Sequence, residues 1–142
     1  MKKEGICNLF ASGIDCSQVV AGEFEEKTGL SKETLRKMAA CFGGGMMCGE
    51  TCGAVCGAYM IIGLVHGHHA EKDFAQKQIM QEKFAQFHEK LKEKYHSTLC
   101  REILGHDISV PGEMDKVLEE GTMFTLCPCL VEDTIHILED IL

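Results

Sequence analysis

The stretch GGGMMCGETCGAVCGAY, residues 43–59, repeats cysteine and glycine at a regular spacing. Cys48, Cys52 and Cys56 are four residues apart, and a glycine directly follows each of them. Because residues four apart share one face of an α-helix, the spacing predicts a helix with a row of thiols beside a glycine groove. Glycine costs about 1 kcal/mol in a helix interior, so three in register favour a close approach by another helix.

These three thiols do not form one metal site on such a helix. At a rise of about 1.5 Å per residue, Cys48 and Cys56 would lie about 12 Å apart along the axis. We therefore take Cys52, at the start of the predicted helix, as the functional thiol of the stretch. Cys48 and Cys56 become small or auxiliary residues, and the groove lets thiols from other segments approach Cys52.

The rest of the chain also predicts helices, since no segment of useful length alternates apolar and polar residues. Capping and stop signals mark the boundaries. The predicted helices run from Asp15 to about Thr28 (stopped by Gly29), from Ser31 to Phe42, from between Met46 and Thr51 to about Val65, over about 70–95, from Ser97 to Leu104, up to about Glu120, and from Pro128 onward. The fold class is thus an all-α, single-domain bundle of five to seven helices over residues 1–142, with a glycine-rich central helix.

Composition excludes several classes of partner. The 142 residues carry a net charge of −8, which argues against nucleic acid and against an anionic membrane surface. The most apolar run, residues 52–65, is shorter than the roughly 20 residues of a membrane span and predicts a core helix rather than membrane insertion. No export signal follows the first lysines, so we expect a cytoplasmic protein, where thiols stay reduced.

Four of the nine cysteines fall at or near the start of a predicted helix. They are Cys16, Cys52, Cys100 and Cys127. Free N–H groups and partial positive charge at a helix start stabilise a thiolate, which is both the nucleophile and the metal ligand. These four thiols are therefore the candidate functional set.

Four motifs in order resemble the C_GCAxxG_C_C family of small redox-active proteins. They are DCSQ at 15–18, GETCGAVCG at 49–57, STLCREILG at 97–105 and CP at 127–128. The resemblance spans residues 16–142 and implies that Cys16, Cys52, Cys100 and Cys127 carry thiol redox or iron–sulfur chemistry, with a lean toward electron transfer.

Three functions remain open at this level. In a thiol-dependent oxidoreductase, Cys52 would attack and Cys16, Cys100 or Cys127 would resolve, with a redox protein as partner; the absence of a CxxC motif counts against this. Alternatively, the four thiolates would hold a [2Fe–2S] cluster, or Zn²⁺, although their separate segments count against it. The third reading is a structural or partner-binding helical protein with buried thiols.

The remaining cysteines and histidines carry weaker signals. Cys48, Cys56 and Cys129 are additional to the family pattern, and Cys129 competes with Cys127 for the fourth position. Cys7 and Cys41 have no counterpart in the family and are expected in the core or on the surface. The cluster His66, His68 and His69 favours an exposed turn over weak metal binding, since no carboxylate or cysteine stands at ligand spacing. The sequence has no signal for the oligomeric state.

Overall fold

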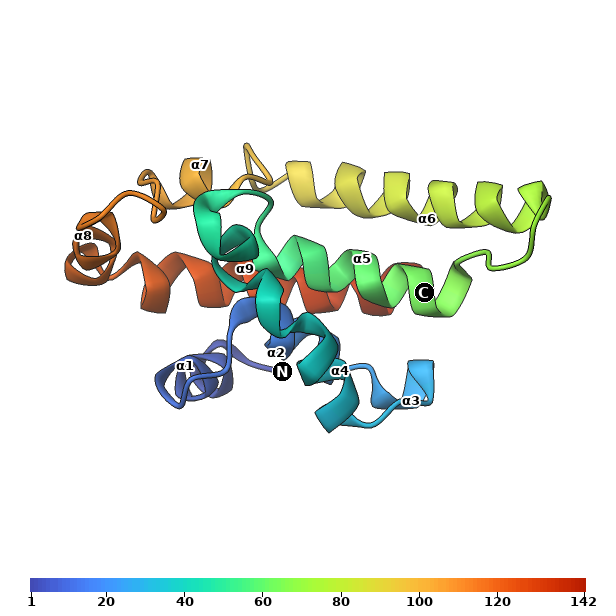
Figure 1. The fold of residues 1–142 in the computed structure, drawn as a ribbon, viewed down its shortest axis with the longest axis horizontal. Helices are drawn as coiled ribbons and strands as arrows, with labels where there is room; N and C mark the ends of the chain where they lie inside the picture. The colour runs from blue at the N-terminus through green and yellow to red at the C-terminus, as the bar shows by residue number, and fades with distance from the viewer.

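The computed structural model describes all residues, 1–142, and contains nine α-helices and no sheet (Figure 1). The helices are α1 (Lys3–Ala11), α2 (Cys16–Gly22), α3 (Glu25–Thr28), α4 (Lys32–Ala39), α5 (Gly53–His66), α6 (Phe74–Lys92), α7 (Cys100–Leu104), α8 (Glu113–Glu120) and α9 (Thr122–Ile141). The all-α single-domain class is confirmed. The count exceeds five to seven because α1 was not expected and the helix predicted from Asp15 to Thr28 is interrupted at Phe24.

Local capping signals are largely confirmed. Asp15 and Gln18 form the capping box of α2, in which the Asp15 N–H donates to the Gln18 side-chain oxygen over 2.9 Å. Gly29 ends α3 with a left-handed φ of 73°. The Ser31 hydroxyl oxygen caps α4 by accepting a hydrogen bond from the Thr34 N–H.

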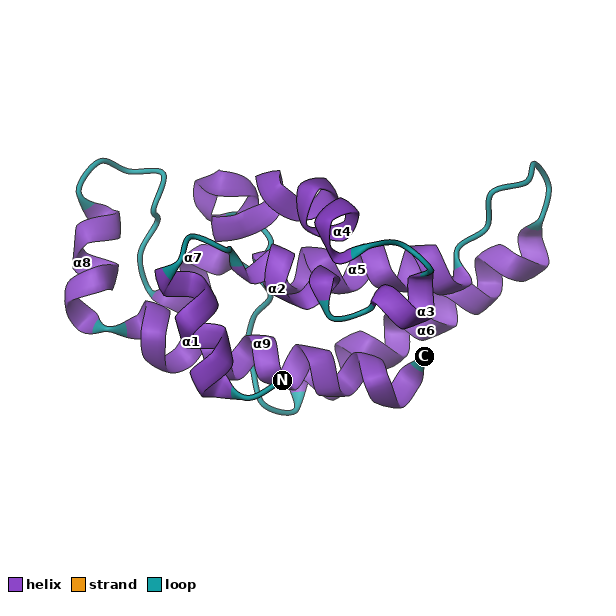
Figure 2. Ribbon diagram, turned by 90° about the horizontal axis from the view of Figure 1, so that it is seen from below, coloured by secondary structure: helices purple, strands orange, loops and turns teal.

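Three long helices form the body of the molecule. In Figures 1 and 2, α5, α6 and α9 run along its long axis, and α1 to α4 gather on one side of this layer. The short helices α7 and α8 lie toward one end of the long axis, with α8 outermost. No helix is long and apolar enough to cross a bilayer.

The glycine groove of α5 does admit a close approach by another helix. A Cβ added to Gly57 would lie 2.9 Å from the Ser17 carbonyl oxygen and 3.1 Å from the Val20 Cβ, both on α2. Side chains of α2 and α5, such as Val20 and Val55, are fully buried beside this contact. Glycine at position 57 therefore fixes how α2, which begins at Cys16, sits against α5.

The start of α5 differs from the prediction. The helix begins at Gly53, so Cys48 and Gly49 lie before it and do not continue its thiol face. Residues 44–47 instead follow a left-handed turn with φ between 57° and 64°. Glycine adopts this conformation freely, whereas Met46 and Met47 each pay about 1–2 kcal/mol. The glycine run thus serves a left-handed turn that helical periodicity does not reveal.

The start of α9 also differs. The helix begins at Thr122, so Pro128 lies inside it, not in its first turn. Proline lacks the N–H that would bond to the carbonyl four residues earlier, that of Phe124. The Cys7 thiol of α1 donates to this carbonyl instead, over 3.7 Å. Cys127 therefore sits within α9, and the prediction of a fourth cysteine at a helix start is wrong.

Candidate functional site: four cysteines at one pocket

A short backbone pairing joins two of the candidate cysteines. Thr51 and Leu99 form an isolated antiparallel bridge. The Cys52 N–H donates to the Thr98 carbonyl and the Cys100 N–H donates to the Glu50 carbonyl, each over 2.7 Å. The bridge holds the start of α5 beside the start of α7, although the two segments are far apart in the sequence.

Two glycines, Gly53 and Gly45, leave room for the side chains of Cys16 and Cys100. A Cβ on Gly53 would overlap the Cys16 sulfur and would lie 2.8 Å from the Phe42 carbonyl oxygen. A Cβ on Gly45 would lie 2.7 Å from the Cys100 Cβ. The backbone next to Cys52 thus packs directly against the Cys16 thiol, which no larger residue would permit.

All four candidate cysteines line one pocket with a volume of about 260 Å³. Cys16 and Cys100 are the first residues of α2 and α7, Cys52 is the N-cap of α5, and Cys127 comes from within α9. Cys52 and Cys100 are buried, whereas Cys16 and Cys127 are partly exposed. Three of the four predicted helix-start positions are found, and the fourth thiol joins them from a helix interior.

Burial, not the helix ends, dominates the acidity of these thiols. It raises the pKa of Cys100 and Cys127 to about 12 and that of Cys52 well above its usual range. The N–H groups of Ala54 and Val55 at the start of α5 lower the Cys52 pKa, but less than burial raises it. The expectation that helix starts would yield thiolates is therefore not met, and at neutral pH these thiols stay protonated.

Cys16 differs from the other three in the number of backbone groups that act on its pKa. Burial raises this pKa, and the backbone N–H groups of Gly44, Ser17 and Ala54 lower it. Charge on Cys16 in turn raises the pKa of Cys52, Cys100 and Cys127. The ionisation of Cys16 is thus coupled to that of the other three pocket thiols.

The four thiols divide into two pairs by their packing. Cys52 belongs to the large hydrophobic core, and Cys16 packs against it. Cys100 belongs to a separate small cluster, and Cys127 packs against that one. No three His, Cys, Asp or Glu side chains converge as they would around one metal ion, so a Zn²⁺ site is not preformed. Two pairs of thiols match in number the four cysteines of a [2Fe–2S] cluster.

The other five cysteines lie outside the pocket lining. Cys48 is exposed, and its thiol donates to the Gly45 carbonyl oxygen. Cys56 is buried, and its thiol donates a hydrogen bond to the Thr51 carbonyl oxygen. Burial raises the pKa of Cys56 to about 11. Cys129 bonds to the Thr125 carbonyl oxygen within α9. Of the competing pair Cys127 and Cys129, Cys127 is the one that lines the pocket.

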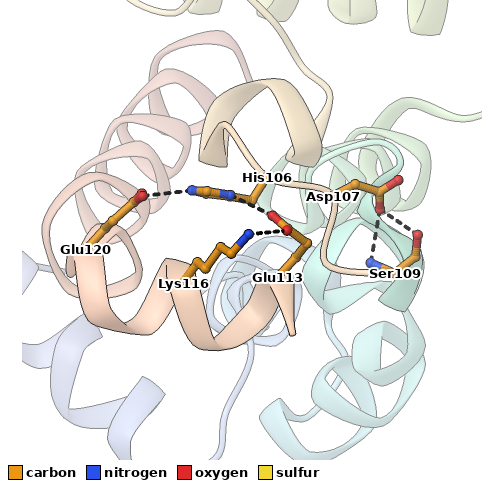
Figure 3. Close-up of polar contacts among 6 residues, drawn as sticks. All are labelled: His106, Asp107, Ser109, Glu113, Lys116 and Glu120. Atoms are coloured by element: carbon orange, nitrogen blue, oxygen red, sulfur yellow. Dashed lines mark hydrogen bonds and ion pairs between the residues drawn. The ribbon is translucent and has the colours of Figure 1, made fainter. Parts of the chain in front are cut away.

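Sequence reasoning missed the outer wall of the pocket. Met114 and Leu118 of α8 and Phe10 of α1 line it, and their residue types resemble ordinary core positions. A polar network holds α8 against the segment that follows α7 (Figure 3). The His106 ring bonds to Glu113 over 2.7 Å and to Glu120 over 2.8 Å, at opposite ends of α8. The sequence signal for this wall was a histidine, His106, followed at intervals of seven residues by two acids, Glu113 and Glu120.

A comparison with protein families finds a match over most of the chain. The family model described as Putative redox-active protein (C_GCAxxG_C_C) matches residues 14–141, which includes all four pocket cysteines and every element that positions them. Neither the curated proteins nor the solved structures yield a match. With nearly its whole length matched, the chain belongs to the redox-active C_GCAxxG_C_C family.

Proposed function

We propose that residues 1–142 form a single redox domain that acts as a thiol-dependent oxidoreductase through a Cys16–Cys52 dithiol/disulfide couple. The observation that carries the proposal is the contact of the Cys16 sulfur with Gly53, the residue next to Cys52. The Ala54 N–H, at the start of α5, lowers the pKa of both cysteines. Both thiols therefore lie near the start of α5.

Cys16 takes the attacking role in this proposal, in place of Cys52. Residue Cys16 is partly exposed, whereas Cys52 is buried, and three backbone N–H groups lower the Cys16 pKa. With a disulfide as acceptor, the Cys16 thiolate attacks one sulfur and the other leaves as a thiolate. Cys52 then loses its proton and attacks the Cys16 sulfur. This closes the Cys16–Cys52 bond and releases the acceptor as two thiols, so two electrons leave the protein.

Cys100 and Cys127 form a second pair of thiols beside the Cys16–Cys52 couple. Their pKa values are raised and they belong to a small separate cluster, so neither thiol suits the initial attack on the acceptor. The pair instead stays reduced and exchanges with the Cys16–Cys52 disulfide. Nine free cysteines fit a reducing, cytoplasmic setting. A redox protein that re-reduces the couple is the partner this chemistry requires.

The second candidate function is electron transfer through a [2Fe–2S] cluster. The observation that favours it is the presence of four thiols, in two pairs, around one pocket. Cys16, Cys52, Cys100 and Cys127 would hold the cluster, which would supply one-electron transfer. The backbone N–H groups around Cys16 and Cys52 would then bond to ligand sulfurs, one of the ways in which a protein sets a cluster's potential.

One preparation separates the two functions. The protein is purified without oxygen, its visible spectrum and iron content are recorded, and its thiols are counted before and after equilibration with oxidised dithiothreitol. We expect a colourless protein that loses two thiols reversibly, with Cys16 and Cys52 joined in the peptide map. A brown protein with about two irons, held by four thiolates, would reject the dithiol couple in favour of the cluster.

Substitutions then test the assignment of the residues. Cys16→Ser and Cys52→Ser should each abolish the two-thiol loss, because either removes one half of the disulfide. Cys41→Ser is the matched control, since Cys41 is exposed and lies outside the pocket lining. If Cys41→Ser has the same effect as Cys16→Ser, the couple does not reside in the pocket.

A further inference from the structure

The pocket extends well beyond the four sulfurs. Of its 18 lining residues, 15 are hydrophobic, the four cysteines included. The walls also come from residues of α1, α7, α8 and α9 that carry no thiol. Two aromatic rings, Phe10 and Phe124, and two thioethers, Met114 and Met123, are among them. Flat aromatic molecules pack favourably against such side chains.

No positive charge lines this pocket. Its members include no lysine, arginine or histidine, and Asp15 is its only carboxylate. A charged molecule that enters an apolar pocket without a counter-charge loses its hydration and gains nothing in return. Anionic redox molecules, such as glutathione disulfide and the nicotinamide nucleotides, are therefore poor occupants.

The entrance of the pocket is apolar as well. Leu118 on α8 is 50% exposed and Phe124 on α9 is 41% exposed, and both line the pocket. The volume of about 260 Å³ is at the small end for a ligand site. It exceeds the roughly 150 Å³ of an engineered apolar cavity that accepts benzene. The size thus fits one substituted ring and not a dinucleotide.

We propose that this pocket binds a small, uncharged acceptor of the quinone class, which oxidises the Cys16–Cys52 pair. The inference rests on the proposed dithiol function. The S–H bonds of Cys16 and Cys52 break and one S–S bond forms between them. The two electrons and two protons pass to the quinone, whose two carbonyl oxygens become the hydroxyls of a hydroquinone. Reactants and products are all uncharged, which an apolar pocket tolerates.

The test uses tetramethyl-1,4-benzoquinone, whose ring has no free position for thiol addition. The fully reduced protein is mixed with it without oxygen, and quinone absorbance and thiol count are followed. We expect one quinone to be reduced for each pair of thiols lost, with a rate that saturates as the quinone concentration rises. Saturation reports binding before reaction, whereas a rate that rises linearly and equals that of free dithiothreitol would overturn the proposal.

Two substitutions at the entrance test where the quinone binds. Leu118→Trp and Met114→Trp add bulk to the pocket lining and should lower the saturable rate about tenfold. Leu64→Trp is the control, because Leu64 is 41% exposed on α5 and lies outside the pocket lining. Its rate should equal that of the unaltered protein. If both pocket variants also keep that rate, the quinone does not use the pocket.

Oxidised dithiothreitol separates this proposal from the dithiol function. If it joins Cys16 to Cys52 while the quinone does not react, the pocket assignment fails and the couple stands. Saturable oxidation by glutathione disulfide, with no saturation by the quinone, would likewise overturn the acceptor class. If no reagent forms the Cys16–Cys52 bond, both proposals fail together.

Discussion

The two thiol pairs sit in regions of very different strength. Cys16 and Cys52 lie against a core of 21 buried residues that α2, α5, α6 and α9 share. Cys100 and Cys127 lie against a cluster of only three buried residues, Cys100, Leu104 and Val117. Both pairs face the same pocket, so one wall of the site lies in the large core, whereas the other rests partly on the small cluster, with Ile103 of α7 joining the large core.

The wall with the smaller cluster should open first. Free energies of local opening follow the buried apolar area, so the α7–α8 region should open well below the cost of global unfolding. Glycines with positive φ, Gly112 and Gly121, bound α8 at its two ends. The polar bridge from His106, just after α7, to Glu113 and Glu120 adds to the packing of Val117 against α7 (Figure 3).

The largest effect should follow from Gly53→Ala, on the strong side. The new methyl would overlap the Cys16 sulfur and the Phe42 carbonyl oxygen, and neither belongs to a long flexible side chain. We expect a loss of about 3 kcal/mol in the free energy of unfolding, measured by urea denaturation. Oxidation of the Cys16–Cys52 pair should also change, because the methyl displaces Cys16.

Gly63→Ala is the matched control on the same helix. An added Cβ at Gly63 meets nothing within 4 Å, and the residue is exposed. Alanine favours a helix over glycine by up to about 1 kcal/mol, so this variant should be slightly more stable. Equal losses for Gly53→Ala and Gly63→Ala would show that helix propensity, not contact with Cys16, governs the first result.

Part of the fold and of the candidate site could be predicted from the sequence. Most of the helices, several caps and three of the four cysteines at helix starts follow from local patterns, because capping and periodicity involve neighbours in the chain. The left-handed turn at 44–47 and the bridge of Thr51 with Leu99 do not, since both depend on contacts between distant segments. The prediction that Pro128 starts the last helix was wrong. Proline suits a first helical turn, but here the contact with α1 compensates for its missing hydrogen bond.

A pair of identical substitutions compares the two regions directly. Val55 in the large core and Val117 in the small cluster are both fully buried. Each Val→Ala change removes two methyl groups and should cost about 2 kcal/mol where it acts. Val55→Ala should lower global stability by that amount. Val117→Ala should mainly promote opening of the α7–α8 region, with a smaller shift in the denaturation midpoint.

Reactivity of Cys100 is the readout for this comparison. In Val117→Ala, a local cost of about 2 kcal/mol should raise the rate of Cys100 alkylation by about 30-fold, followed by peptide mass spectrometry. In Val55→Ala, the rate should change little under native conditions. If the two variants expose Cys100 equally, the molecule opens as one unit and the contrast between the regions fails.

A smaller effect should come from the bridge that holds α8. Hydrogen bonds to Glu120 and then to Glu113 raise the pKa of His106 above its ordinary value. The protonated ring is therefore stabilised in the folded state. Its contribution is complete below the ordinary histidine pKa of about 6.5 and is lost as the pH rises through the higher folded value. An NMR titration of the His106 ring should show this raised pKa.

Substitution of the acids identifies the source of that shift. Glu120→Gln should lower the His106 pKa toward its ordinary value and should increase the alkylation of Cys100 at a fixed pH near 6. An unchanged His106 pKa in Glu120→Gln would mean that the bridge is absent in solution.

The smallest effect should come from the contact between Cys7 and the Phe124 carbonyl of α9. The Cys7 thiol is a weak donor, and its bond to the Phe124 carbonyl oxygen is long, at 3.7 Å. Cys7→Ala should therefore cost about 0.5 kcal/mol or less in urea denaturation, below the usual value for a hydrogen bond. In a Pro128→Ala background the restored N–H at position 128 satisfies the same carbonyl, so the cost of Cys7→Ala should vanish. If Cys7→Ala still lowers the free energy of unfolding in the Pro128→Ala background, Cys7 contributes by packing. The hydrogen bond to the Phe124 carbonyl would then not account for its effect.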